Sequence, residues 1–196
     1  MVDTYIGIAA HSDEPEPQLI SKAELFVKAL RDFCSEARIV LGGYWGLMKV
    51  VADEALRNGF TVVILPPAEM EGVGFPKEAI VVKTGTSFRV RSVFLARTSD
   101  VLVVLGGGAG CLQELVTAYT ERKPVVVLVD TGYPTDMVSS WPTYLDNRML
   151  APIIKTSDPV EAARIACNQV RATHVGSEKT TLKLHREYGN SAKLLG

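Results

Sequence analysis

The feature that most constrains the fold of this 196-residue chain is a regular alternation of short apolar runs with longer stretches of helical periodicity. The apolar runs are rich in β-branched residues and cover Tyr5–Ala10, Arg38–Leu41, Phe60–Leu65, Ile80–Val82, Val101–Leu105, Val125–Val129 and Ile153–Ile154. Strands without polar alternation are typical of a sheet that is buried on both faces. Because helical stretches separate the runs, the pattern predicts a doubly wound parallel sheet with helices on both faces, an α/β fold of Rossmann-like type.

The helical stretches set the expected domain boundaries. They cover residues 19–36, 46–58, 88–98, 111–122, 136–148 and 158–172. We expect one Rossmann-like domain over residues 1–170, a length that can bury a full core. The remaining residues, 171–196, form a polar tail with more basic than acidic side chains. This tail is either a solvated terminus or an arm that packs on a neighbouring subunit.

Charge and cysteine content exclude several classes of function. The formal net charge is −1, so no overall field attracts nucleic acid or an anionic membrane, and we expect neither as a partner. No run reaches the ~18 apolar residues of a membrane span, and the N-terminus lacks a leader pattern. Three cysteines (Cys34, Cys111 and Cys167) form no CxxC pair. We therefore expect no disulfide framework, a reducing compartment and a cytoplasmic protein.

A glycine-rich turn joins the fifth apolar run to the helix that follows it, in "VLVVLGGGAGCLQELVTAY" over residues 101–119. A helix N-terminus has unpaired N–H groups and a partial positive charge, and glycines keep side chains away from an approaching anion. The turn therefore predicts a phosphate-binding site at Gly107, Gly108 and Gly110, next to Cys111. The alternative is a turn that is glycine-rich only because strand and helix pack closely.

A second loop repeats this pattern in "IVLGGYWGLMKVVADEAL", where Gly42, Gly43 and Gly46 precede a helix. Neither loop matches GxGxxG or GxxxxGK[ST], which argues against dinucleotide and P-loop chemistry. Ligands of open α/β sheets bind beyond the carboxyl ends of the strands, and both loops follow strands. Two such turns favour a mononucleotide, and Ser12, which follows the first strand, is expected at the same edge unless it is only a polar loop residue.

Two opposite charges are expected to meet at this edge. Arg91 and Glu114 lie early in consecutive predicted helices, and such helices begin at the same edge of a parallel sheet. We expect the two charges to meet over one crevice, with Arg89 adding positive charge nearby. The alternatives are a first-turn acid that complements the helix dipole and an exposed helix charge.

Cys111 and the three histidines are the candidate reactive or metal-binding groups. A cysteine at a helix start can have a lowered pKa, but no histidine lies near Cys111 in the sequence, so a small residue that fits the turn is favoured. His11, His174 and His185 lack the spacing of metal ligands. We therefore expect no metal site.

These motifs together resemble a known superfamily. Arg91 followed by "SDVLVVLGGGAGCLQE" is similar to the LOG (Lonely guy) group, whose signature is an arginine, an apolar strand and PGGxGTxxE. "GGYWGLMKVVADEAL" and "GFTVVILP" resemble the group's first glycine loop, helix and next strand. "DTGYPTDM" and "YLDNR" are closer to a less characterised archaeal and bacterial branch, related to molybdenum cofactor carrier proteins. The resemblance covers about residues 4–170.

The resemblance implies a function. LOG enzymes, once misnamed lysine decarboxylases, release a free base from a nucleoside 5′-monophosphate. By this resemblance the glycines of the second turn bind the 5′-phosphate, Glu114 holds the ribose hydroxyls or orients water, and Arg91 stabilises developing charge. It also implies a homodimer or larger homo-oligomer and no required cofactor. The alternative is a protein without turnover that carries molybdenum cofactor, a phosphorylated pterin, or senses an AMP-like nucleotide.

Several residues depart from the LOG signature. Gly106 replaces the proline, Cys111 the threonine and Gln113 the first of two acids, while Arg89 and Ser92 stand where histidine and lysine are usual. These departures retain an anion site and weaken the case for hydrolysis.

Overall fold

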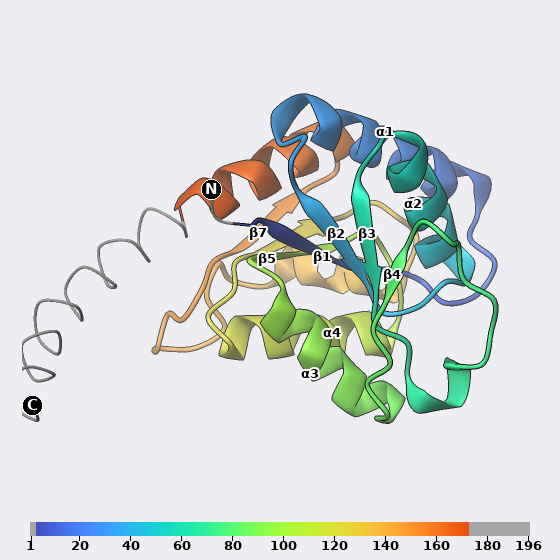
Figure 1. The fold of residues 1–196 in the computed structure, drawn as a ribbon. Helices are drawn as coiled ribbons and strands as arrows, with labels where there is room; N and C mark the ends of the chain where they lie inside the picture. The colour runs from blue at the N-terminus through green and yellow to red at the C-terminus, as the bar shows by residue number, and fades with distance from the viewer. Residues whose placement is uncertain (1–2, 173–196) are drawn as a thin grey trace, which may run out of the picture.

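Seven parallel strands form one sheet in the order β4-β3-β2-β1-β5-β6-β7 in the computed structural model, which describes residues 3–172 (Figure 1). The strands are β1 Tyr5–Ala9, β2 Arg38–Leu41, β3 Thr61–Ile64, β4 Ile80–Val81, β5 Val101–Val104, β6 Val125–Leu128 and β7 Ile153–Thr156. Each lies at an apolar run of the sequence. The predicted parallel α/β fold is therefore confirmed.

Helices cover both faces of this sheet (Figure 1). They are α1 Pro17–Phe33, α2 Gly46–Arg57, α3 Phe88–Thr98 and α4 Ala109–Thr120, with short 3-10 helices η1 Ala68–Met70 and η2 Pro134–Ser140. The chain is again helical over residues 159–172. One apolar layer joins the sheet to α1, α2 and this last helix, and a second joins it to α3 and α4.

The predicted helix over residues 136–148 is wrong. The structure has η2 and then turns, since Pro142 removes a backbone donor and cannot continue a helix. The buried hydroxyl of Tyr119 instead accepts the N–H groups of Asp146 and Leu150, at 3.3 and 3.4 Å. The loop therefore satisfies its backbone through a side chain of α4.

The order of the strands reverses between β1 and β5. From β1 the chain adds β2, β3 and β4 on one side, then returns through α3 to place β5 against the other side of β1. The loops after β1, β2 and β5 therefore emerge at the same edge, around the switch point. Crevices of this kind are the usual ligand sites of open α/β sheets.

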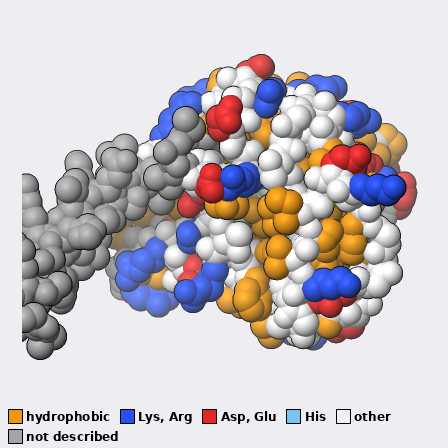
Figure 2. All heavy atoms as spheres, in the orientation of Figure 1, with side chains coloured by type: hydrophobic (Ala, Val, Ile, Leu, Met, Phe, Trp, Pro, Cys, Tyr) orange, Lys and Arg blue, Asp and Glu red, His pale blue; other side chains and the backbone are white. Residues whose placement is uncertain are grey.

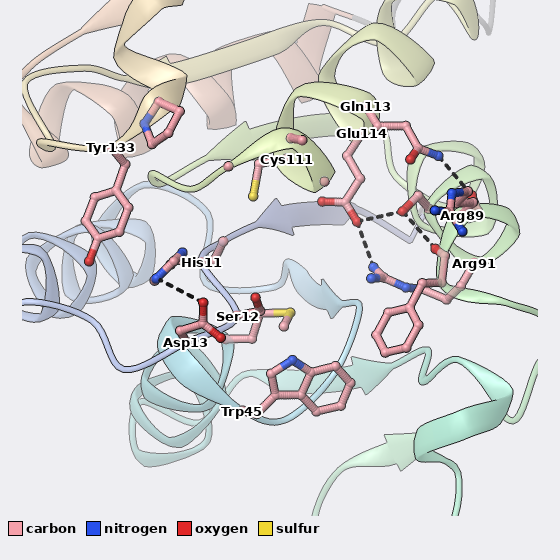
Figure 3. A pocket seen from close by; sticks show the side chains of 18 residues that line it. His11, Ser12, Asp13, Trp45, Arg89, Arg91, Cys111, Gln113, Glu114 and Tyr133 are labelled. Carbon is pink, nitrogen blue, oxygen red and sulfur yellow. Dashed lines mark hydrogen bonds and ion pairs between the residues drawn. The ribbon is translucent and has the colours of Figure 1, made fainter.

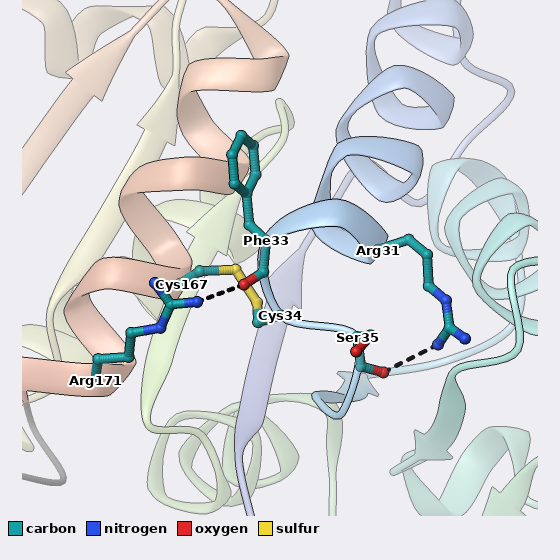
Figure 4. The surroundings of a disulfide bond; sticks show 6 residues. All are labelled: Arg31, Phe33, Cys34, Ser35, Cys167 and Arg171. Atoms are coloured by element: carbon teal, nitrogen blue, oxygen red, sulfur yellow. Dashed lines mark hydrogen bonds between the residues drawn. A yellow bond between two sulfur atoms is a disulfide. The ribbon is translucent and has the colours of Figure 1, made fainter.

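A disulfide joins Cys34 to Cys167, a pairing that runs against the expectation of no disulfide framework (Figure 4). The two cysteines are 133 residues apart in sequence, with Cα atoms 5.9 Å apart. They meet because α1 and the helix over residues 159–172 cover the same face of the sheet. Beside the disulfide, Arg171 Nη2 donates to the carbonyl of Phe33 at 2.6 Å. Cys111 is free and buried.

The tail predicted over residues 171–196 is described only at its start, where residues 171–172 continue the helix; residues 173–196 lie outside the described part of the chain. Within residues 3–172, no helix is both long and apolar enough to cross a membrane.

Apolar side chains remain exposed on the outer surface of α3 and α4. Phe94 and Val116 are both more than 40 % exposed, whereas Leu115 and Tyr119 belong to the core. Figure 2 shows apolar side chains on this part of the surface. The homo-oligomer stays a prediction.

Candidate functional site

A cavity of about 670 Å³ opens at the switch point, within the size range of small-molecule sites. Its wall comes from the loop after β1 and from the first turns of α2, α3, α4 and η2. Segments that are far apart in the sequence therefore meet at the edge where the sequence placed the ligand. Figure 3 shows the side chains that line it.

Arg91 and Glu114 form a buried ion pair in this wall. Arg91 Nη1 donates to Glu114 Oε1 at 2.7 Å, and the two residues are only 7 % and 5 % exposed. Arg91 comes from the first turn of α3 and Glu114 from the second turn of α4, so the two helices bring the charges together as the topology predicted. The Nε atom of Arg91 is buried without a hydrogen-bond partner in the described structure.

Ser92 is a third member of this cluster, and the sequence reasoning did not place it in the site. Its hydroxyl donates to the same Oε1 of Glu114 at 3.1 Å. The second oxygen of Glu114 has no hydrogen bond within residues 3–172, and Figure 3 shows it directed toward the middle of the cavity. The carboxylate therefore has one oxygen held by protein and one available to a ligand.

Burial raises the pKa of the two titratable groups of α4 that line the cavity, Glu114 and Cys111. It raises the pKa of Glu114, and the attraction of Arg91 and the Ser92 hydrogen bond oppose this only in part. Burial also raises the pKa of the Cys111 thiol to about 12. Cys111 is therefore a neutral thiol at pH 7 and not an activated nucleophile, which agrees with the small-residue interpretation.

The first turn of α4 supplies backbone donors to the cavity. The first N–H groups of a helix have no intrahelical acceptors. The N-cap of α4 is Gly108, and no side chain of the described residues caps this helix. Gly108, Ala109 and Gly110 line the cavity. Gly107 does not, because its N–H donates to Thr135 Oγ1 at 3.1 Å and its carbonyl accepts from Thr135 N at 3.1 Å.

The three glycines of the first loop lie behind the cavity wall instead of in it. A Cβ on Gly42 would overlap the guanidinium of Arg91, and one on Gly43 would overlap the ring of Trp45. Gly46 has φ +52° and lies against the backbone of residues 12–13. The loop therefore makes room for groups that line the cavity, and the start of α2 is occupied by a bond from Leu47 N to the carbonyl of His11 at 2.9 Å.

Gly42→Ala is expected to lower the free energy of unfolding by about 1–3 kcal/mol, because the added methyl group displaces a guanidinium that is already packed and paired. Urea denaturation measures the change. Gly72→Ala is the matched control, since a Cβ there meets nothing within 4 Å, and it should change stability by less than about 1 kcal/mol. Equal losses in both variants would contradict this role of Gly42.

Aromatic side chains occupy two parts of the wall. Trp45 and Phe88 pack edge to face with centroids 6.4 Å apart, and His11 and Tyr133 lie 4.5 Å apart (Figure 3). Ser12 and Arg89, both predicted site residues, also line the cavity and are exposed.

Tyr133 was missed by the sequence reasoning. It reaches the cavity because Asp136 accepts the N–H groups of Thr131 and Gly132, at 2.9 and 2.8 Å, and so folds the turn after β6. Asp136, the second aspartate of "DTGYPTDM", was the sequence signal for this turn. Aspartate side chains commonly accept backbone N–H groups and so organise turns.

A seven-stranded doubly wound sheet with a cavity at its switch point defines a Rossmann-like domain with a candidate small-ligand site. The chain matches the SLOG cluster4 family over residues 3–162 and belongs to that family. The resemblance to the LOG-like superfamily is thereby confirmed. No curated protein matches the chain in sequence.

Among solved structures, the protein TM1055 is similar, with a TM-score of 0.72 and 28 % identity over 83 % of this chain and 97 % of its own. The molybdenum cofactor carrier protein MCP of Chlamydomonas reinhardtii has a TM-score of 0.68 and 23 % identity over 87 % of this chain and 99 % of its own. The molybdenum cofactor binding protein of Rippkaea orientalis has a TM-score of 0.65 and 19 % identity over 89 % and 99 %. The last two likenesses concern the fold.

Proposed function

We propose that this protein binds a nucleoside 5′-monophosphate, or a similarly phosphorylated small ligand, in the cavity at the switch point. The observation that carries the proposal is the uncapped first turn of α4, which opens into the cavity beside the buried pair of Arg91 and Glu114. Backbone N–H groups at a helix start bind phosphate, and a neighbouring acid and guanidinium can bind what the phosphate carries.

Each part of the wall has a role in this proposal. The N–H groups of Ala109 and Gly110 hold the phosphate, and Arg89 adds positive charge at the exposed side. The open oxygen of Glu114 accepts a hydrogen bond from a sugar hydroxyl. The ring of Trp45 offers an apolar face to a base. Side chains and backbone that lie together in one cavity support this assignment.

As a catalytic form of this function, we propose hydrolysis of the N-glycosidic bond. The oxygen of water forms a bond to C1′ of the sugar and the bond from C1′ to the base nitrogen breaks. One proton of the water goes to the departing base, and the other stays on the new C1′ hydroxyl. The Glu114 carboxylate would orient the water and stabilise positive charge on the sugar. A preorganised charge of this kind supplies ~3 kcal/mol, about a hundredfold in rate.

The alternative is a carrier or sensor without turnover. Glu114 is already paired with Arg91 and hydrogen-bonded to Ser92, so groups of the protein already compensate part of its negative charge. A phosphorylated pterin would use the same helix start for its phosphate. The names of two similar structures, a molybdenum cofactor binding protein and a carrier protein, support keeping this alternative.

Incubation with AMP and with N6-substituted AMP, followed by chromatography, tests the two forms. We expect free base from the parent protein and about a hundredfold slower release from Glu114→Gln, because the amide cannot stabilise positive charge. Glu121→Gln, at the opposite end of α4, is the matched control and should retain the parent rate. Binding of AMP by calorimetry without base release favours the carrier. A protein that neither binds AMP nor releases base contradicts the proposal.

A further inference from the structure

We infer that Ser92 is a positioning residue for Glu114: its hydroxyl holds one carboxylate oxygen inside the protein, so that the other oxygen faces the ligand. The inference deepens the proposed function and rests on it only for the identity of the ligand.

The geometry around Glu114 is asymmetric. Arg91 Nη1 and Ser92 Oγ both donate to Oε1, at 2.7 and 3.1 Å, and within residues 3–172 Oε2 has no hydrogen bond. Ser92 is 4 % exposed, so water does not replace its hydroxyl readily. Two donors that approach the same oxygen from α3 fix the rotation of a carboxylate that extends from α4. One donor alone would leave that rotation free.

A hydroxyl suits this position in both protonation states of the carboxyl group. Ser92 Oγ also lies 3.2 Å from the carbonyl of Phe88, one turn earlier in α3. When Glu114 is ionised, the hydroxyl proton goes to the charged acceptor, which forms the stronger bond. When Glu114 is protonated, the hydroxyl can turn to Phe88 and accept the acid proton. Neither state leaves the Ser92 hydroxyl without a hydrogen-bond partner.

Other charged and titratable groups near Glu114 do not replace Ser92. Arg91 shares its oxygen, and Cys111 on α4 is a buried neutral thiol. Arg89 from α3, and His11 and Asp13 from the loop after β1, line the same cavity without a hydrogen bond to Glu114. Loss of the Ser92 hydroxyl therefore leaves the carboxylate with Arg91 alone, in a setting where burial already favours the protonated form.

Carbon-13 NMR of labelled glutamate carboxyl groups tests this in the ligand-free protein, with the Glu114 signal assigned from Glu114→Gln. In Ser92→Ala we expect the pKa of Glu114 to rise by about one unit, since a hydrogen bond to an ionised group is lost. Ser92→Thr keeps a hydroxyl and should restore the parent value. Ser99→Ala is the matched control, because Ser99, the C-cap of α3, is also buried and its Oγ donates one turn back, to the carbonyl of Leu95. If the Ser92→Ala protein does not fold, Ser92→Cys replaces it in the test, because a thiol is a weak donor of similar size.

The second measurement is binding of AMP by calorimetry at pH 7, where we expect about tenfold weaker binding by Ser92→Ala and parent-like binding by Ser92→Thr and Ser99→Ala. An unchanged Glu114 titration in Ser92→Ala overturns the inference, whether or not AMP binds. A Glu114 pKa that rises in Ser92→Ala and has the parent value in Ser92→Thr supports the inference. If the pKa of Glu114 rises in Ser92→Ala but the parent protein does not bind AMP, the positioning role stands and the proposed ligand class fails.

Discussion

Replacing Arg91 with leucine is expected to lower the free energy of unfolding by about 3–5 kcal/mol at neutral pH. Both members of the pair with Glu114 are buried, and this pairing compensates the carboxylate for the water it has lost. Without the guanidinium, the carboxylate must remain buried and charged with only the Ser92 hydrogen bond, or take up a proton. Urea denaturation of the parent and the variant at pH 7 measures the loss.

The loss should shrink as the pH falls. Burial raises the pKa of Glu114 in the folded protein, and removal of Arg91 raises it further because the largest opposing attraction is gone. Between the ordinary pKa of an unfolded glutamate and this raised value, the folded state binds more protons than the unfolded state. By linkage, stability then increases toward acid and decreases as the pH rises through that interval. The variant and the parent should therefore differ least at low pH, where the carboxyl is neutral in both.

The double variant Arg91→Leu/Glu114→Leu is the matched control. It replaces the ion pair with apolar side chains and leaves no unpaired charge, so most of the stability lost in Arg91→Leu should return. If the double variant is as unstable as the single variant, packing of the Arg91 side chain is the cause of the loss and its pairing is not.

The sheet could be predicted from the sequence because its strands are buried on both faces. Val101–Val104 and Val125–Leu128 are entirely buried, and such short runs rich in β-branched residues indicate strands of a parallel sheet. The meeting of Arg91 with Glu114 was also predictable, since topology alone places the starts of α3 and α4 at one edge. Among the predicted helices, the one over residues 136–148 is wrong, because Pro142 cannot continue a helix and the Tyr119 hydroxyl accepts backbone N–H groups of this segment.

Contacts across the fold could not be predicted in the same way. Gly42 reads as a phosphate-binding glycine in sequence, and its packing against Arg91 becomes visible only once β2 lies next to the start of α3. Ser92 is one hydroxyl among many until Glu114 is found beside it. Cys34 follows α1 and Cys167 lies in the helix over residues 159–172, so they can pair only if both helices cover the same face of the sheet. Strand–helix alternation does not specify which face a helix covers.

Reduction of that disulfide is expected to lower the free energy of unfolding by about 2–5 kcal/mol. A crosslink between residues separated by 133 positions restricts the unfolded chain over a long loop, and the loss of chain entropy in the unfolded state stabilises the folded state. Denaturation of the parent protein with and without a reducing agent measures the effect.

The variant Cys34→Ala/Cys167→Ala should have the stability of the reduced parent and should not respond to the reducing agent, since Cys111, the free cysteine of the described residues, forms no crosslink there. Arg171→Ala is a second control: it removes the hydrogen bond to Phe33 next to the disulfide, is exposed, and should cost about 1 kcal/mol or less. If reduction leaves the parent unchanged while Arg171→Ala destabilises it, noncovalent contacts hold the helix over residues 159–172 to α1. A loss on reduction that the double alanine variant reproduces assigns that attachment to the covalent bond.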